Sequence, residues 1–232
     1  MKKLIVIPTY NEKENIQSIV PAVFDQNLGV DILVVDDNSP DGTGNLVKEM
    51  AQKYPNLHLL SRKGKEGLGK AYLAGFDWAL KSGYDIVVEM DADFSHRPRD
   101  LTPLLEALKT YDFAVGSRYV PGGTTVGWGL LRKIISKGGG FYSRLILGYP
   151  LRDWTGGFNA WKREALLGMS LGDVKSEGYS FQIELKYRAQ KRGFKGTEVP
   201  IVFEDRRVGH SKMSSRIVLE AIYRVWSIRS VS

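Results

Sequence analysis

Residues 86–96, IVVEMDADFSH, join a short apolar segment directly to a pair of aspartates. The segment 86–90 has the length and the branched residues of a buried strand. While the chain stays extended, its period of two puts Asp91 and Asp93 on the same side, so both carboxylates can converge on one hard cation. The stretch therefore predicts a strand of a covered sheet, with a Mg²⁺ or Mn²⁺ site at its carboxyl end.

The same pattern extends outward through the first half of the chain. Further strand-length apolar runs lie at 4–7, 32–35, 57–60 and 113–115, and segments with helical spacing of apolar residues lie between them. This alternation predicts an α/β fold with a mostly parallel central sheet flanked by helices, in which ligands bind beyond the carboxyl ends of the strands. The second half predicts helices at 130–147 and 181–191, a strand at 198–203 and a final helix from about Arg216.

Polar residues follow the first two predicted strands. After the first strand, Tyr10 offers a flat ring on which a base could stack and Glu12 offers an acceptor, although an ordinary strand-to-helix turn also explains both. After the second strand, Asp41 or Thr43 could cap a helix. The adjacent Asp36 and Asp37 are harder to explain, because one of them must point inward at a cost unless it meets a partner.

The 232 residues carry 33 Lys and Arg against 26 Asp and Glu, a net charge of +7. Residues 1–115 have a net charge of −4 and residues 116–232 one of +11. The basic half predicts an anionic partner, which can be nucleic acid, a phosphorylated substrate or an anionic membrane; a solvated cationic face is the alternative. The absence of cysteine excludes thiol nucleophiles, disulfides and Cys-ligated metals.

One phosphate-binding motif is almost complete. Residues 64–71, GKEGLGKA, fit G-x-x-x-x-G-K-[ST] except at the last position, where Ala71 has no hydroxyl for Mg²⁺. No strand-to-helix junction supplies G-x-G-x-x-G for a dinucleotide. Both an NTPase and a nicotinamide enzyme are therefore disfavoured.

Seven sequence blocks occur in an order that is typical of one family. They are IPTYNEKENI (7–16), VVDDNSPDGT (34–43), GLGKAYLAGF (67–76), VVEMDADFSHRP (87–98), VGSRYVPGG (115–123), DWTGGFNAW (153–161) and DRRVGHSK (205–212). Together they resemble the catalytic domain of family 2 glycosyltransferases, and within it the polyprenyl-phosphate (dolichol-phosphate) mannosyltransferases. The resemblance runs from Leu4 to about Lys212, so we expect a catalytic domain at 1–212, followed by a helical tail at 213–232. It implies a GT-A fold, in which a nucleotide-binding α/β sheet merges with an acceptor-binding half.

The resemblance also implies roles for individual residues. Asp91 and Asp93 match the metal ligands, and Ser95 stands where other members supply a third ligand, with an intervening water as the alternative for so short a side chain. The residues that match nucleotide-binding positions are Pro8, Tyr10, Glu12, Val35, Asp37, Lys70, Ala92, Arg206 and Lys212. Arg118, Arg132, Arg206 and Lys212 match basic positions that bind the phosphates of donor and acceptor.

The reaction that the resemblance implies is inverting transfer of mannose from GDP-mannose to the phosphate of dolichol or another polyprenyl phosphate, which supplies a lipid-linked sugar for glycosylation. A related transferase that uses UDP-glucose or another acceptor is the alternative. A phosphate monoester is largely dianionic at neutral pH and already nucleophilic, so a strong general base is dispensable. Asp153 lies near the acceptor in this family, either as a positioning residue or as a base; a helix cap or a buried partner for an arginine is the structural alternative.

The tail from Arg216 is basic and amphipathic and contains Trp226, which is compatible with an anionic membrane surface or with packing on the domain. No apolar run approaches the ~18 residues that span a bilayer. We therefore expect a cytoplasmic protein that docks peripherally on the cytoplasmic face of a membrane, beside a membrane-anchored partner subunit or alone, unless the sequence is part of a longer chain. Nucleic acid is not expected as a partner, because no recognised reading motif is present.

Overall fold

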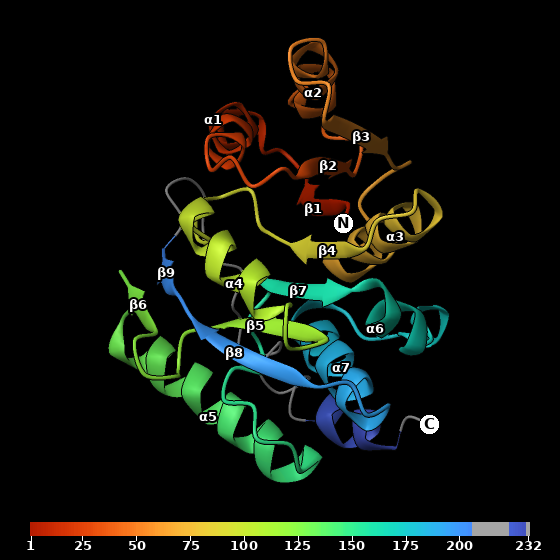
Figure 1. Cartoon of the computed structure of the whole chain (residues 1–232). Coiled ribbons are helices and arrows are strands. Elements are labelled where there is room, and N and C mark those ends of the chain that lie inside the picture. Colours follow the sequence, from red (N-terminus) through yellow and green to blue (C-terminus); the bar gives the residue numbers. More distant parts are fainter. Residues whose placement is uncertain (206–222, 231–232) are drawn as a thin grey trace.

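The structure is a computed structural model that describes residues 1–205 and 223–230. Seven strands form one sheet in the order β3-β2-β1-β4-β7-β5-β8 (Figure 1). They are β1 (Lys3–Thr9), β2 (Asp31–Asp36), β3 (Leu57–Ser61), β4 (Ile86–Glu89), β5 (Phe113–Ser117), β7 (Asn159–Lys162) and β8 (Gly196–Pro200). All neighbouring strands are parallel except β7, which runs antiparallel to both β4 and β5.

The predicted mostly parallel sheet is thus confirmed, but β7 was not predicted. Its four residues are too few to show a periodic pattern, and they follow two glycines at 156 and 157 that read as a loop. Trp161 of this strand is fully buried against Phe113, with ring centroids 5.0 Å apart. Tertiary packing, rather than a local pattern, therefore decides that this segment is a strand.

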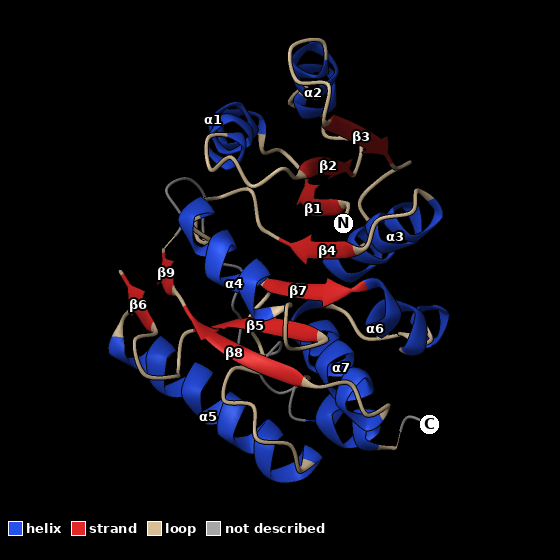
Figure 2. Ribbon diagram, viewed as in Figure 1, coloured by secondary structure: helices blue, strands red, loops and turns tan. Residues whose placement is uncertain are grey.

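Helices cover both faces of the sheet, as Figure 2 shows. Leu4 and Val6 point to one face, where α3 (Leu68–Lys81), α6 (Arg163–Gly168) and α7 (Gly178–Lys191) pack. Ile5 and Ile7 point to the other face, toward α1 (Lys13–Phe24), α2 (Thr43–Ala51) and α4 (Leu101–Ala107). This strict alternation along β1 follows from the period of two in a strand, and it produces two hydrophobic cores, one on each face.

The predicted strand at 198–203 is two strands in the structure. β8 pairs with β5, whereas β9 (Val202–Glu204) pairs with β6 (Thr124–Val126) in a separate two-stranded sheet. The chain changes sheets at Ile201, whose N–H donates to Ser117 while its carbonyl accepts from Thr124. This change of direction carries Phe203 to the pocket described below.

Two further helices complete the described chain. α5 (Leu130–Leu147) lies along the edge of the molecule beside β8, and residues 223–229 form a helix near α7 (Figure 1). Val225 and Ile228 are buried in the same core as α3 and α7, and the Trp226 indole donates to the hydroxyl of Tyr142 on α5. Two short 3-10 helices lie at Pro98–Asp100 and Leu171–Asp173. In the part of the chain that the structure describes, no helix is both long enough and apolar enough to cross a membrane.

Candidate active site

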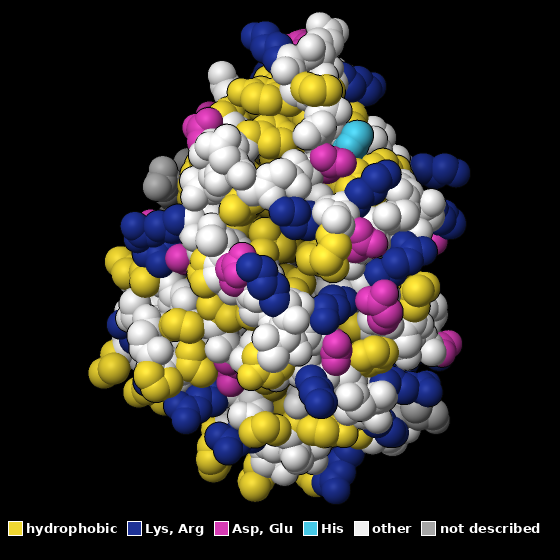
Figure 3. Space-filling view, viewed as in Figure 1, with side chains coloured by type: hydrophobic (Ala, Val, Ile, Leu, Met, Phe, Trp, Pro, Cys, Tyr) yellow, Lys and Arg dark blue, Asp and Glu magenta, His cyan; other side chains and the backbone are white. Residues whose placement is uncertain are grey.

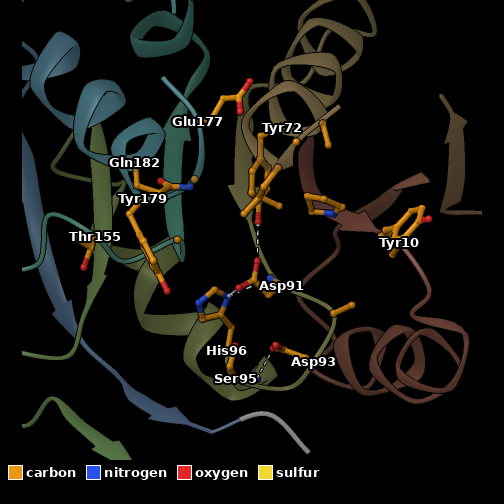
Figure 4. A pocket seen from close by; sticks show the side chains of 18 of the residues that line it. Tyr10, Tyr72, Asp91, Asp93, Ser95, His96, Thr155, Glu177, Tyr179 and Gln182 are labelled. Atoms are coloured by element: carbon orange, nitrogen blue, oxygen red, sulfur yellow. Dashed lines mark hydrogen bonds and ion pairs between the residues drawn. The ribbon is translucent and has the colours of Figure 1, made fainter. Parts of the chain in front are cut away.

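A pocket of about 500 Å³ opens where β1, β2 and β4 end. The strand order reverses direction between β1 and β4, and such a switch point is the usual place for a ligand in an open α/β sheet. In Figure 4, Tyr10 lies on one side of the pocket and Thr155, Tyr179 and Gln182 lie on the other, with the loop after β4 between them. The pocket therefore joins the acidic first half of the chain to the basic second half.

On the β1 side, Pro8, Tyr10, Glu12 and Asp37 all line the pocket. Lys65 extends over the Tyr10 ring, with its Nζ 4.2 Å from the ring centroid. Asp37 is 5% exposed and pairs with Arg62 at 2.6 Å, so the buried carboxylate has the partner that its position requires. Burial raises the pKa of Asp37 above its ordinary value, although Arg62 opposes the shift.

Asp91 and Asp93 both line the pocket, but not through extended chain. β4 ends at Glu89, and the following residues turn, with Phe94 at a φ of 62°. The expected extended backbone is therefore not observed at residues 92 and 93, although both aspartates still line the pocket. The Ser95 N–H donates a hydrogen bond of 3.1 Å to the Asp93 carboxylate, which stabilises the turn. The Tyr72 hydroxyl donates to Asp91 at 3.2 Å (Figure 4).

The loop after β4 has donors that suit a hard divalent cation. Two carboxylates face the pocket, and the Ser95 hydroxyl is buried with no hydrogen-bond partner among the described residues. A buried hydroxyl without a partner is costly, and a ligand that uses its oxygen would remove that cost. Within the described chain, no group of three or more acidic, histidine or cysteine side chains forms a closed metal site. The donors thus fit Mg²⁺ or Mn²⁺, which commonly take one or two carboxylates and complete their shell with water and phosphate oxygens.

His96 also lies in the pocket, although it is not among the predicted site residues. Its ring is 1% exposed and stacks on Phe158 with centroids 4.8 Å apart. Nδ1 accepts the backbone N–H of Asp91 at 3.0 Å, so this nitrogen carries no proton in the arrangement observed. Burial lowers the pKa of His96. The imidazole is therefore neutral and holds the backbone of the carboxylate loop.

Arg118 and Asp153 form a fully buried ion pair after β5. The guanidinium donates to both carboxylate oxygens, at 2.8 and 2.6 Å, and also to Thr155 at 2.8 Å. Burial alone would raise the pKa of Asp153, but the Arg118 charge and its hydrogen bonds outweigh burial and lower it. Arg118 lines the pocket, whereas Asp153 is 0% exposed and does not. Of the roles that the sequence left open for Asp153, the geometry thus favours that of a buried partner for an arginine over that of a general base.

Arg132 comes from the first turn of α5 and lines the same pocket as Arg118. Its Nη1 donates to Asp205 at 3.0 Å, and its side chain is 21% exposed. The structure therefore brings together two carboxylates and two arginines that lie far apart in the sequence.

The remaining predicted residues are distributed differently. Ala92 lines the pocket. The Val35 side chain is fully buried in the core, and Lys70 pairs with Glu66 on the surface, so neither side chain lines the pocket. Lys70 points away from the pocket because Leu68 and Ala71 occupy the pocket-facing side of the first turn of α3. Arg206 and Lys212 lie outside the described residues.

A buried polar network behind the pocket was also missed. Glu89 is fully buried and accepts from Trp161 at 2.7 Å, from Gln182 at 2.6 Å and from Asn159 at 3.2 Å. Burial raises the pKa of Glu89, and these donors oppose the shift. Lys186, also buried, donates to the carbonyls of Trp154 and Gly156, and burial lowers its pKa. A single glutamate inside an apolar strand was the signal that could have revealed this network.

Known proteins resemble this chain over nearly its whole length. The sequence pattern of glycosyl transferase family 2 matches residues 4–168. A polyprenol monophosphomannose synthase from Mycolicibacterium smegmatis is 50% identical, covering 98% of this chain and 88% of that protein. An undecaprenyl-phosphate mannosyltransferase from Micrococcus luteus is 47% identical over 97% of this chain and 93% of that protein. A dolichol-phosphate mannosyltransferase from Pyrococcus furiosus is 36% identical over 98% of this chain and 64% of that protein.

Solved structures share the fold at lower identity. A glucosyl-3-phosphoglycerate synthase from Mycobacterium tuberculosis, in complex with Mn²⁺, UDP and glucosyl-3-phosphoglycerate, has a TM-score of 0.68 at 18% identity and covers 100% of this chain and 81% of its own. A mannosyltransferase from Pyrobaculum calidifontis in complex with GDP-Man and Mn²⁺ has a TM-score of 0.66 at 19% identity. The match covers 100% of this chain and 65% of that one. These likenesses concern the fold, and they confirm the expected GT-A type.

Proposed function

This chain belongs to glycosyl transferase family 2 and is a glycosyltransferase, and on that premise we propose that it transfers mannose from GDP-mannose to the phosphate of a polyprenyl phosphate. The relatives that match nearly all of this chain are named for mannosyl transfer to a polyprenol, an undecaprenyl phosphate or a dolichol phosphate. The product is a mannosyl phospholipid that can serve as a sugar donor in glycosylation.

The observation that carries this proposal is one pocket that contains an acidic pair and a basic pair. Asp91 and Asp93 suit a metal-bound diphosphate, and Arg118 and Arg132 suit a second phosphate. A transfer between a sugar nucleotide and a lipid phosphate needs both kinds of site at once, because two mutually repelling phosphates must be held close together. In this proposal the nucleotide lies along Tyr10, Glu12 and Asp37, and the acceptor phosphate lies beside the arginines.

In the proposed reaction, an oxygen of the acceptor phosphate attacks C1 of mannose. A bond from C1 to the acceptor oxygen forms as the bond from C1 to the β-phosphate oxygen breaks, and GDP leaves with the electron pair. The attack is in line, so the configuration at C1 inverts. A divalent cation, when bound, stabilises the negative charge that grows on the diphosphate.

No general base is required in this scheme. The second pKa of a phosphate monoester is about 6, so the acceptor enters as a nucleophilic dianion near neutral pH. Asp153 cannot serve easily as a base, because Arg118 and the Gly156 N–H occupy both of its oxygens. We assign Asp153 a positioning role, in which it orients the Arg118 fork toward the phosphate.

Peripheral binding to the cytoplasmic face of a membrane is part of the proposal. Leu131, Ile134, Phe141 and Leu145 recur on one face of α5 and are between 59% and 72% exposed. Figure 3 shows hydrophobic side chains gathered over α5 at the lower left, with basic side chains among them. An apolar helix face with basic neighbours suits a lipid surface. The tail at 213–232 is proposed to contribute to the same surface, and a membrane-anchored partner subunit is the other occupant to be tested.

A donor panel tests the proposal. The full chain is incubated with undecaprenyl phosphate and with radiolabelled GDP-mannose or UDP-glucose, with Mg²⁺, with Mn²⁺ or with EDTA, and label extracted into organic solvent is counted. We expect lipid-linked label from GDP-mannose only when a divalent cation is present. Undecaprenol, which lacks the phosphate, is the matched control and should give none. Product from UDP-glucose but not from GDP-mannose would overturn the assignment of mannose as the sugar. No product from either donor would overturn the assignment of a polyprenyl phosphate as the acceptor.

A further inference from the structure

The two pocket arginines are held in different ways. Arg118 is 6% exposed, and Asp153 binds it through two hydrogen bonds. Among the described residues, Arg132 forms one ion pair, with Asp205, whose side chain is 42% exposed. An exposed ion pair is screened by water and contributes about 0–1 kcal/mol. Two like charges in one pocket repel each other, and the exposed pair with Asp205 offsets little of that repulsion.

Trp128 is in contact with both guanidinium groups. The Arg132 carbon Cζ lies 3.9 Å from the centroid of the Trp128 ring, and the Arg118 Cζ lies 5.3 Å from the same centroid. Both distances are within the ~6 Å over which a cation is attracted to an aromatic face, and tryptophan provides the strongest attraction of the aromatic side chains. One indole ring therefore lies within cation–π distance of two positive charges.

The surroundings of Trp128 keep its ring in place. The residue is 9% exposed between β6 and α5, and Phe203 contacts the ring edge-on at a centroid distance of 5.3 Å. Gly127 before it has a φ of 80°, which favours glycine, and a Cβ there would lie 3.0 Å from Asp205. The backbone is therefore shaped to bring Trp128 and Asp205 close together at Arg132.

The polar atom of the indole does not explain the position of Trp128. Its Nε1 is buried and has no hydrogen-bond partner among the described residues, although buried indole N–H groups usually find one. The ring thus stays buried although its N–H group lacks a hydrogen bond within the described part of the chain. Its face, which both arginines meet, is the part that contacts functional groups.

We propose that Trp128 is a positioning residue whose ring face holds Arg132 beside Arg118, so that the two form one site for the phosphate monoester of the acceptor. This inference rests on the proposed function for the identity of the acceptor. The nucleotide side of the pocket does not depend on Trp128, because Tyr10, Asp37, Asp91 and Asp93 come from the ends of β1, β2 and β4.

Binding of farnesyl phosphate, a short polyprenyl phosphate, tests this role by calorimetry without any donor. Trp128→Leu removes the aromatic face and Trp128→Phe retains one. We expect the Kd for farnesyl phosphate to rise about 2- to 30-fold in Trp128→Leu, which corresponds to a cation–π contact of about 0.5–2 kcal/mol. Trp128→Phe should recover most of the loss, and the Kd for GDP should stay within twofold in both variants. In turnover, the KM for the acceptor should rise while the KM for GDP-mannose does not.

A double-mutant cycle links the effect to Arg132. In an Arg132→Ala background, Trp128→Leu should have little further effect on the Kd for farnesyl phosphate. Trp78→Leu removes a partly buried tryptophan of α3 that packs on His58 and Tyr84, away from the pocket, and should leave this Kd unchanged. If Trp128→Leu lowers the melting temperature, Trp128→Met replaces it, because methionine fills irregular space without an aromatic face.

The inference is overturned by an unchanged Kd in Trp128→Leu, by an equal rise in Trp128→Phe, or by a rise for GDP instead of farnesyl phosphate. Because binding is measured without a sugar donor, the result is independent of whether GDP-mannose is the donor. Failure of the wild-type protein to make a mannosyl lipid would count against the proposed function alone.

Discussion

Asp153 and Asp91 show how surroundings give two aspartates near one pocket different roles. Asp153 is fully buried, and Arg118 and backbone N–H groups occupy its oxygens, which lowers its pKa. Asp91 lies at the pocket wall with a side chain that is 30% exposed. Charge that faces the pocket can act on a ligand, whereas charge that is neutralised internally can only position its partner.

At the residue scale, Asp93→Asn should abolish metal-dependent transfer. The substitution keeps the size of the side chain but removes the negative charge that a divalent cation requires. We expect mannosyl transfer to fall by at least about 100-fold, the scale seen when charge stabilisation is lost in a transition state. Titration of Mn²⁺ binding by electron paramagnetic resonance should show weaker binding.

Asp77→Asn is the matched control for this substitution, because Asp77 pairs with Lys81 on the surface of α3. It should retain wild-type activity and Mn²⁺ affinity. Full activity of Asp93→Asn would contradict the metal assignment.

Asp153→Asn should destabilise the protein, because it leaves the Arg118 charge buried without its partner. The loss in the free energy of unfolding should be about 3–5 kcal/mol at pH 7, measured by urea denaturation. The folded pKa of Asp153 lies below its ordinary value of 3.8, so its stabilising contribution is present above that pH and is lost as the pH falls through the folded pKa. The difference between wild type and variant should therefore be constant from pH 7 to about 5 and should shrink below about pH 4. A difference that does not change with pH would refute the linkage.

At the scale of elements, α3 approaches the sheet closely because Gly75 has no side chain. A Cβ at this position would lie 2.5 Å from Cγ1 of Val6 on β1. The close approach matters for the pocket, because Tyr72 on the same helix donates to Asp91. Helix packing and the orientation of a pocket carboxylate are thus connected through a single turn of α3.

Two glycine-to-alanine substitutions separate packing from helix propensity. Gly75→Ala should lower the free energy of unfolding by about 1–3 kcal/mol, because the added methyl group overpacks the interface with β1. Gly138→Ala, in α5, meets no atom within 4 Å and should raise it by up to about 1 kcal/mol, since alanine favours a helix more than glycine does. Chemical denaturation of both variants measures the difference. Equal effects of the two changes would show that helix propensity, not packing, controls α3.

At the scale of the whole molecule, the pocket and the exposed face of α5 belong to one surface region. Arg132 lies on the first turn of α5 and lines the pocket, while Leu131 and Ile134 on the same turns are exposed. A lipid phosphate that enters from a membrane under this helix would reach the arginines without leaving the interface. In the proposed membrane complex, the positive charge of the second half would add long-range attraction to anionic lipid headgroups.

The variant Ile134→Glu with Phe141→Glu should weaken binding to vesicles that contain anionic phospholipids. We expect a reduction of at least about tenfold in co-sedimentation affinity, because two apolar contacts are lost and two negative charges face the headgroups. Leu167→Glu on α6 is the control, since Leu167 is 58% exposed but lies on a different helix. Unchanged vesicle binding would contradict a lipid surface for α5 and would favour a protein partner on this face.

Local pattern alone was sufficient for the framework of this protein. Strand-length apolar runs predicted β1 to β5, and apolar residues at helical spacing predicted the helices between these strands as well as α5 and α7. The strand ends predicted where Tyr10, Asp37, Asp91 and Asp93 gather. These predictions succeed because the carboxyl ends of parallel strands meet at one edge of a sheet, so short-range order along the chain determines long-range proximity. The seven ordered blocks also predicted the family and its GT-A fold, and the family match and the structural neighbours confirm both.

Tertiary structure decided the features that depend on partners distant in sequence. β7 is a strand because Trp161 packs on Phe113, and Asp153 is neutralised because Arg118 lies beside it. The buried Glu89 network joins β4 to Gln182 of α7, which lies 93 residues further along the chain. His96 and Trp128 lie near their partners in the sequence, but turns of the folded chain set the contacts of His96 with Asp91 and of Trp128 with the two arginines. Sequence determined which chemical groups reach the pocket region, but the role of each group depends on which neighbours remove it from water, and only the folded chain specifies them.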